Sequence, residues 1–259
     1  MQRTAKTALV TGASAGLGTH FARLFAADGH DLVLIARRRD RLDQLATELR
    51  QAHGIHTIVI PADLTDPQAP LHVHEELTRT GLEIQFLVNN AGFGTSGTFA
   101  ELDLARELEL IELNITALTH LTGLILPGMI ARRSGRILNV GSAAGFLPGP
   151  FMATYYASKA YVLSFTEALA HELRGTGVTA TVLCPGPTAT EFAHVAGTES
   201  SALFKGVADA GRVALYGYRA MHRGKTIAIP GVANKLSLQA LRVSPRSMIR
   251  LFAGRLNKP

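Results

Sequence analysis

The sequence has very little cysteine and lacks long apolar runs. Cys184 is the only cysteine, which excludes an internal disulfide and is typical of a reducing compartment. No apolar run reaches the ~18 residues that a membrane-spanning helix needs. The N-terminus "MQRTAKTALVTG" enters a predicted strand at once, without the pattern of a signal peptide. We therefore expect a soluble, cytoplasmic protein.

Acidic residues are absent from the last 50 residues. All 20 Asp and Glu lie before residue 210, together with 16 of the 26 Lys and Arg, so the net charge is −4 for residues 1–209 and +10 for residues 210–259. The overall charge of +6 therefore belongs to the C-terminal segment. No nucleic-acid recognition motif accompanies it, so nucleic-acid binding is not expected.

Residues 232–259 form a basic amphipathic extension. Leucines, Met248 and Phe252 are interleaved with arginines, and Pro245 divides the segment into two pieces. Such a segment can lie on an anionic membrane surface. We favour packing on the domain or on a sister subunit, with the arginine heads directed outward.

Residues 1–231 alternate short aliphatic runs with longer amphipathic stretches. This alternation requires crossover connections, so it predicts one α/β domain: a Rossmann-like, doubly wound parallel sheet of about seven strands with helices on both faces. Strands are predicted in "TALVTG", "DLVLIA", "HTIVIPADL", "IQFLVNNAG", "GRILNVGS", "GVTATVLCPG" and "KTIAIPG". Helices are predicted at 18–29 and 39–54, and at about 66–80, 104–132, 153–174 and 208–222.

A glycine-rich loop follows the first predicted strand. "TGASAGLG" places Gly12, Gly16 and Gly18 between a strand and a helix, where the backbone can approach a pyrophosphate at the helix N-terminus. The spacing differs from the common dinucleotide fingerprint, so the strand–turn–helix context carries the interpretation. A plain glycine-rich turn is the alternative.

The end of the second strand indicates which dinucleotide fits. "LIARRRDRL" has Arg37 and Arg38 where an acid would contact the ribose of NAD, and Asp40 lies too far along to replace it. Arginine forks suit a 2′-phosphate. NADP(H) is therefore favoured over NAD(H), although the arginines could also simply open a solvated helix.

Six motifs occur in a fixed order between residue 7 and about residue 190. They are "TGASAGLG", "NNAG" at 89–92, Asn114, Ser142, "YYASK" and "PG" at 185–186. Ser142 lies thirteen residues before Tyr155, and Lys159 lies four after it. This pattern resembles the classical short-chain dehydrogenase/reductase family. The resemblance implies an NADP(H)-dependent oxidoreductase that reduces a carbonyl to an alcohol.

The resemblance also implies roles for four residues. Tyr155 is implied to donate the proton, Ser142 to polarise the carbonyl, and Asn114 to hold a water in a proton relay. A neighbouring ammonium stabilises a phenolate, so Lys159 is expected to lower the pKa of Tyr155 as well as to hold the nicotinamide ribose. Tyr156 and Tyr161 are interpreted as packing residues.

The resemblance also implies which individual residues contact the cofactor and the substrate. Ala15 departs from the family, since many NADP(H) members have a basic residue there, so Arg37 would carry more of the phosphate recognition. The substrate is expected between residues 143–151, the loop after "NNAG", and an apolar segment at about 190–207 that includes Leu203 and Phe204. Ordinary packing of a short helix is the alternative for that segment. The expected cofactor contacts are Gly12, Ser14, Gly16, Leu17, Gly18, Arg37, Arg38, Asp63, Leu64, Asn90, Ala91, Gly92, Tyr155, Lys159, Pro185, Gly186, Thr188 and Thr190, and the expected substrate contacts are Ser142, Phe93, Phe146 and Phe192.

The sequence supports three further interpretations. His72 and His74 face different directions on a helix, so no metal site is expected. A nucleotide-binding scaffold without turnover is an alternative function, and a methyltransferase with a similar glycine loop is a weaker one. The resemblance implies a small-molecule carbonyl substrate and a homo-oligomer, either a dimer or a tetramer. The apolar segment at about 190–207 favours a hydrophobic substrate.

Overall fold

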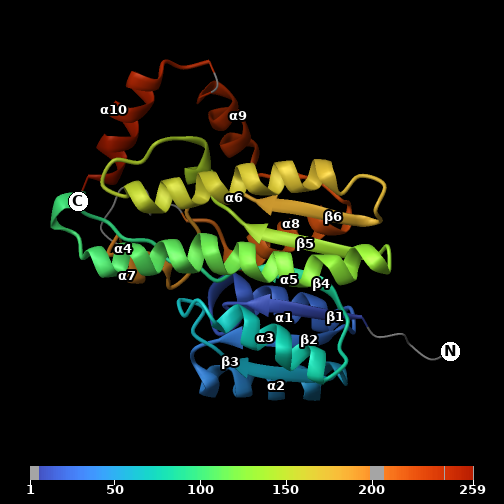
Figure 1. Cartoon of the computed structure of the whole chain (residues 1–259). Coiled ribbons are helices and arrows are strands. Elements are labelled where there is room, and N and C mark those ends of the chain that lie inside the picture. The colour runs from blue at the N-terminus through green and yellow to red at the C-terminus, as the bar shows by residue number, and fades with distance from the viewer. Residues whose placement is uncertain (1–5, 199–206, 242, 259) are drawn as a thin grey trace.

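A computed structural model describes residues 6–198, 207–241 and 243–258. Its centre is a seven-stranded parallel sheet in the order β3-β2-β1-β4-β5-β6-β7 (Figure 1). The order reverses between β1 and β4, which creates the switch-point crevice at which ligands of open α/β sheets bind. The strands are β1 (Thr7–Thr11), β2 (Asp31–Ala36), β3 (Thr57–Pro61), β4 (Ile84–Asn89), β5 (Gly135–Val140), β6 (Val178–Leu183) and β7 (Ile227–Ala228). This sheet confirms the predicted fold class.

Helices cover both faces of the sheet because the strands alternate their apolar side chains. Along β2, Leu32 and Leu34 join one core cluster, whereas Val33 and Ile35 join the cluster on the opposite face. One face carries α1 (Gly16–Ala27), α2 (Arg39–His53) and α8 (Ala210–His222), and the other carries α3 (Ala69–Arg79), α5 (Leu118–Ala131) and α6 (Ala153–Glu172).

The predicted helix at about 104–132 is divided in the structure. It comprises α4 (Leu104–Ile111), a π-helical segment (Glu112–Ala117) and α5. The π segment contains Asn114, and widened turns of this kind occur frequently at functional sites.

The same run bears on the expectation that no apolar run is long enough to span a membrane. Among the residues that the structure describes, Leu104–Ala131 is long and apolar enough, by length and composition, to cross a membrane, with a mean hydropathy of 1.4 over its best window. In the fold, α5 lies against β4, β5 and α3.

The C-terminal extension forms two helices, α9 (Val232–Leu241) and α10 (Arg246–Asn257), with Pro245 immediately before α10. They stand out from the sheet at the C-terminal end of the chain (Figure 1). Ile249, Ala253 and Asn257 form the buried side of α10. Met248, Leu251 and Phe252 are exposed on another side of it.

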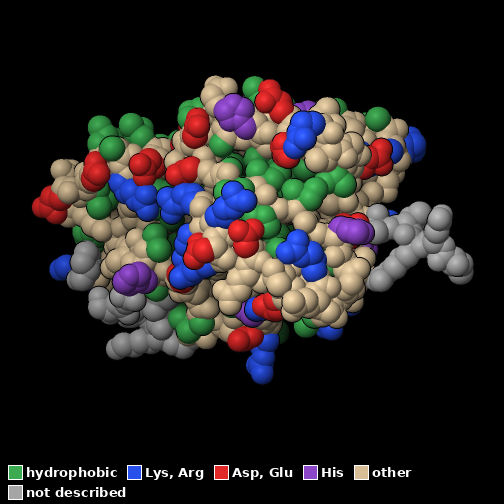
Figure 2. Space-filling model, turned by 90° about the horizontal axis from the view of Figure 1, so that it is seen from below, with side chains coloured by type: hydrophobic (Ala, Val, Ile, Leu, Met, Phe, Trp, Pro, Cys, Tyr) green, Lys and Arg blue, Asp and Glu red, His purple; other side chains and the backbone are tan. Residues whose placement is uncertain are grey.

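Charged residues of both signs share the molecular surface. Figure 2 shows one face on which Lys and Arg side chains lie among Asp and Glu side chains, with apolar groups between them. This face has no uniformly basic surface of the kind that tracks a nucleic-acid backbone.

Candidate active site

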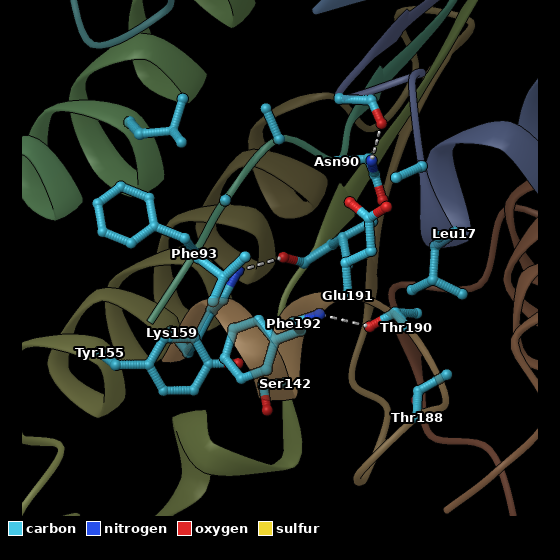
Figure 3. A pocket seen from close by; sticks show the side chains of 18 of the residues that line it. Leu17, Asn90, Phe93, Ser142, Tyr155, Lys159, Thr188, Thr190, Glu191 and Phe192 are labelled. Carbon is cyan, nitrogen blue, oxygen red and sulfur yellow. Dashed lines mark hydrogen bonds between the residues drawn. The ribbon is translucent and has the colours of Figure 1, made fainter. Parts of the chain in front are cut away.

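A cavity of about 490 Å³ opens at the carboxyl ends of the strands. Its walls come from the loops after β1, β2, β3, β4, β5 and β6, and from one side of α6 (Figure 3). Parallel strands bring these loops to a single edge, so motifs far apart in the sequence meet there. The predicted residues that line the cavity are Gly12, Ser14, Gly16, Leu17, Arg37, Arg38, Asp63, Leu64, Asn90, Ala91, Gly92, Phe93, Ser142, Tyr155, Lys159, Pro185, Gly186, Thr188, Thr190 and Phe192.

The glycine loop has a backbone that requires glycine. Gly12 and Gly16 have φ angles of 64° and 54°, in the left-handed region that residues with a Cβ rarely adopt. Gly18 does not line the cavity. A Cβ there would collide with the carbonyl oxygen of Gly12, so Gly18 allows α1 to begin directly beneath the loop. The resulting cradle, with the N-terminus of α1 beside it, fits a pyrophosphate.

Asn90 holds the neighbouring loop against this cradle. Its side-chain Nδ2 donates to the carbonyl oxygen of Thr11 at 2.9 Å. The Thr11 hydroxyl in turn accepts from the backbone N–H groups of Asn90 and Ala91 at 2.9 and 3.0 Å. The "NNAG" motif thus fixes the spacing between the ends of β1 and β4.

Ser14 and two arginines form the basic end of the cavity. Arg38 donates from Nε and Nη2 to the Ser14 hydroxyl at 3.3 and 3.2 Å. Arg37 lies 3.8 Å from the Asp63 carboxylate and is largely exposed. This arrangement offers guanidinium and hydroxyl donors where a cofactor phosphate can bind.

Ser142, Tyr155 and Lys159 meet at the other end. Ser142 follows β5, and its hydroxyl accepts from the backbone N–H of Ala144 at 3.1 Å and hydrogen-bonds Tyr155. Lys159 lies one helical turn after Tyr155 on α6, and its Nζ donates to the carbonyl oxygen of Val140 at 2.9 Å. Both side chains are buried, with exposed fractions of 8% for Tyr155 and 6% for Lys159.

Burial is the main cause of the shifted pKa values of Tyr155 and Lys159, and the expected lowering of the Tyr155 pKa by Lys159 stays a prediction. Desolvation raises the pKa of Tyr155 to about 12, against a smaller lowering by the Ser142 hydrogen bond. Desolvation also lowers the pKa of Lys159 to about 8. The Lys159 ammonium faces Val140 and lies 5.8 Å from the centre of the Tyr155 ring. In this structure burial of the phenol outweighs the hydrogen bond from Ser142.

Asn114 lies beside the cavity and does not line it. Its Oδ1 accepts from the backbone N–H of Phe93 at 3.1 Å, and its Nδ2 donates to the Phe93 carbonyl at 2.9 Å and to Ser158 Oγ at 3.0 Å. Both amide protons are therefore used, and Oδ1 keeps one lone pair for a further donor. In the structure Asn114 therefore positions the loop after β4 that contains Phe93. Its role in a proton relay stays a prediction.

Apolar side chains enclose the Tyr155 end. The Phe192 ring, from α7 (Phe192–Ala196), lies 5.1 Å from the Tyr155 ring, and Phe93 is buried nearby (Figure 3). The expectation for Phe146 requires correction, because its side chain packs against the cluster of Leu118, Val162 and Leu163 and does not line the cavity. Leu203 and Phe204 lie outside the described residues.

Among the residues of the cavity wall that sequence reasoning missed, three make contacts between distant parts of the chain. Tyr156 lines it, but its hydroxyl donates to Asn257 Oδ1 at 3.0 Å, so this tyrosine is already partnered. Leu256 of α10 also lines the cavity, which brings the C-terminal extension into the site. Glu191 reaches across from the segment after β6 to Arg38 at 2.9 Å. These contacts span more than 100 residues, so no local pattern indicates them.

The fold and site together are those of a nucleotide-dependent oxidoreductase, with a phosphate cradle at one end and a buried Ser–Tyr–Lys group at the other. Residues 6–200 match the model of the short chain dehydrogenase family. The chain belongs to this family, and it is an enzyme acting on CH–OH or C=O groups.

Curated relatives and solved structures agree with the family. The chain is 42% identical to sulfoacetaldehyde reductase 2 of Chromohalobacter salexigens over 72% of this chain and 74% of that protein. It is 34% identical to the ketoacyl reductase HetN of Nostoc sp. over 96% and 88%. A Sphingobium yanoikuyae short-chain dehydrogenase in complex with NADPH superposes with a TM-score of 0.84 at 36% identity, covering 92% and 93% of the two chains. A Burkholderia phymatum member in complex with NAD superposes with a TM-score of 0.83 at 27% identity, covering 91% and 92%.

Proposed function

We propose that this enzyme uses NADP(H) to reduce hydrophobic ketones or aldehydes to alcohols, with Tyr155 as the proton donor. The observation that carries the proposal is the position of the Tyr155 hydroxyl. It lies in a cavity whose other end presents the glycine cradle and two arginines, with a hydroxyl partner in Ser142 and an apolar wall in Phe192.

The chemistry assigns a task to each of the chain's own residues. A bound nicotinamide would supply the hydride. Tyr155 and Ser142 donate hydrogen bonds to the substrate oxygen, which gains negative charge as the carbonyl is reduced. Tyr155 then gives its proton to that oxygen. Lys159, with a pKa of about 8, can accept and release a proton close to neutral pH and so restore the tyrosine.

The preference for NADP(H) rests on the chemistry of Arg37, Arg38 and Ser14. Two guanidinium groups and a hydroxyl suit a dianionic 2′-phosphate, while the end of β2 carries no acid for a ribose hydroxyl. The relative solved with NADPH supports this choice, and the one solved with NAD defines the alternative.

The substrate class rests on the cavity wall. Phe93, Met152, Phe192 and Leu256 surround the Tyr155 end with apolar surface. Such a wall binds hydrophobic groups and excludes water from the reacting carbonyl. The ketoacyl reductase relative supports an oxo substrate with an apolar portion.

Substitution of Tyr155 by phenylalanine tests the proposal. We expect NADPH oxidation with a panel of hydrophobic ketones and aldehydes to fall by about two to four orders of magnitude, the range of general acid catalysis. Tyr161→Phe is the matched control, because that hydroxyl lies 2.9 Å from Thr119 and outside the cavity. An unchanged rate in Tyr155→Phe would refute the assignment. NADPH binding by the wild type without turnover on the panel would instead favour the nucleotide-binding scaffold.

We also propose that the enzyme is a homo-oligomer. Leu104 and Leu108 of α4 have exposed fractions of 62% and 56%, and a sister subunit would cover such side chains. Light scattering coupled to size exclusion would show a dimer or tetramer, and a monomer at micromolar concentration would refute it. The cytoplasmic location stays a prediction.

A further inference from the structure

Glu191 bridges the two sides of the cofactor cavity. One carboxylate oxygen lies 2.9 Å from Arg38 Nη1, and the other accepts from Arg41 Nη1 at 2.6 Å. These arginines begin α2, whereas Glu191 follows β6, 150 residues further along the chain than Arg41. Hydrogen bonding to Arg41 and Arg38 holds the pKa of Glu191 below its ordinary value. The side chain is therefore an anion at neutral pH.

This carboxylate completes the set of partners around Arg38. Nε and Nη2 of that guanidinium already donate to the Ser14 hydroxyl, and Nη1 faces Glu191. All three nitrogens are thus engaged with protein atoms. Nη1 and Nη2 each keep one further N–H, so an incoming phosphate that binds this edge of Arg38 does so beside the negative charge of Glu191.

The neighbours of Glu191 connect the bridge to both ends of the site. Thr190 lies against the glycine loop, since a Cβ on Gly16 would be 3.1 Å from Thr190 Cγ2. The Thr190 hydroxyl accepts from the backbone N–H of Phe192 at 3.2 Å, and Phe192 packs on Tyr155 (Figure 3). A change in the position of Glu191 therefore involves the residue that covers the catalytic tyrosine.

We propose that Glu191 is a specificity-determining residue whose carboxylate competes with the 2′-phosphate of NADP(H) for Arg38. The inference rests on the proposed function, because it presumes that the cavity binds this nucleotide. Binding of a 2′-phosphate at the Nη1 edge of Arg38 displaces the carboxylate from that guanidinium and leaves Glu191 joined to α2 through Arg41. A dinucleotide without that phosphate leaves the bridge in place.

Equilibrium titration of NADPH and NADH by nucleotide fluorescence tests this inference. Glu191→Gln removes the charge while keeping the shape, so NADPH should bind about threefold to fivefold more tightly, the upper part of the scale for exposed ion pairs. NADH affinity should change less than twofold. Glu48→Gln is the matched control, since Glu48 pairs with Arg23 at 2.9 Å on the surface, and it should change neither affinity.

A double-mutant cycle separates competition at Arg38 from a general structural effect. In an Arg38→Gln background, Glu191→Gln should no longer tighten NADPH binding. Unchanged NADPH affinity in Glu191→Gln would leave the proposed function intact and would overturn the role proposed for Glu191. Equal weakening of both nucleotides would also overturn it, and would make Glu191 a clasp over the cofactor. Failure of the wild type to bind either nucleotide would overturn the proposed function as well.

Discussion

Replacing Lys159 by methionine is expected to make the folded protein more stable while abolishing turnover. Burial lowers the pKa of Lys159 from 10.5 to about 8, which corresponds to about 3 kcal/mol of unfavourable free energy for keeping the charge in the folded protein. The substitution also removes the hydrogen bond to the Val140 carbonyl, a loss of about 1 kcal/mol. The net gain in the free energy of unfolding at pH 7 is therefore about 2 kcal/mol.

The gain depends on pH in a defined direction. Because the ammonium is disfavoured only in the folded protein, the unfolded chain binds more protons than the folded chain between about pH 8 and pH 10.5. Wild-type stability from this group therefore rises over that interval. The advantage of Lys159→Met should be full below pH 8 and should shrink as the pH rises, and above about pH 10.5 the variant should be less stable than the wild type by the ~1 kcal/mol of the lost hydrogen bond.

Urea denaturation of the wild type and the variant at several pH values measures the difference directly. At pH 7, a gain of about 2 kcal/mol raises the melting temperature by roughly 4–8 °C for a domain of this size. Lys225→Met, at an exposed position, is the control and should leave stability within about 0.5 kcal/mol. A Lys159→Met protein that is less stable than the wild type at pH 7, or a difference independent of pH, would refute the reasoning.

Two further substitutions examine the cradle and the C-terminal extension. Gly18→Ala places a methyl group against the Gly12 carbonyl. We therefore expect the free energy of unfolding, measured by urea denaturation, to fall by about 2–4 kcal/mol, and NADPH binding to weaken. A variant as stable as the wild type would show that the loop moves to accommodate the methyl group. Asn257→Ala leaves the Tyr156 hydroxyl and the Pro150 carbonyl without this partner. We expect the free energy of unfolding to fall by about 1–2 kcal/mol. We also expect a raised KM for large ketones with little change in kcat. An unchanged KM would indicate that α10 does not shape the substrate end.

Much of the fold follows from local sequence patterns. The alternation of apolar runs predicts the seven strands, and each predicted strand appears in the structure at nearly the same residues. The division of the helix at Glu112–Ala117 was not predicted from the sequence. Asn114 in that segment bonds to both backbone groups of Phe93, and hydrophobic periodicity contains no trace of such a contact.

The site was predictable where spacing along one element determines geometry. Tyr155 and Lys159 share a face of α6 because they are four residues apart, and parallel strands bring Ser142 to the same edge. The bridge from Glu191 to α2 and the contact of Asn257 with Tyr156 join segments 150 and 101 residues apart. Side-chain contacts between distant loops depend on the folded backbone, which the linear sequence does not display.

The proton affinity of Tyr155 shows why residue types alone give an incomplete account of this site. A lysine one turn away predicts a lowered pKa, yet enclosure by apolar residues raises it to about 12. The same enclosure lowers the pKa of Lys159 to about 8, so the two groups are held apart in proton affinity by one cause. A tyrosine that keeps its proton until negative charge develops on a neighbouring oxygen is suited to act as an acid. The apolar wall therefore has two roles, since it binds the substrate and also keeps the proton on Tyr155 until the carbonyl requires it.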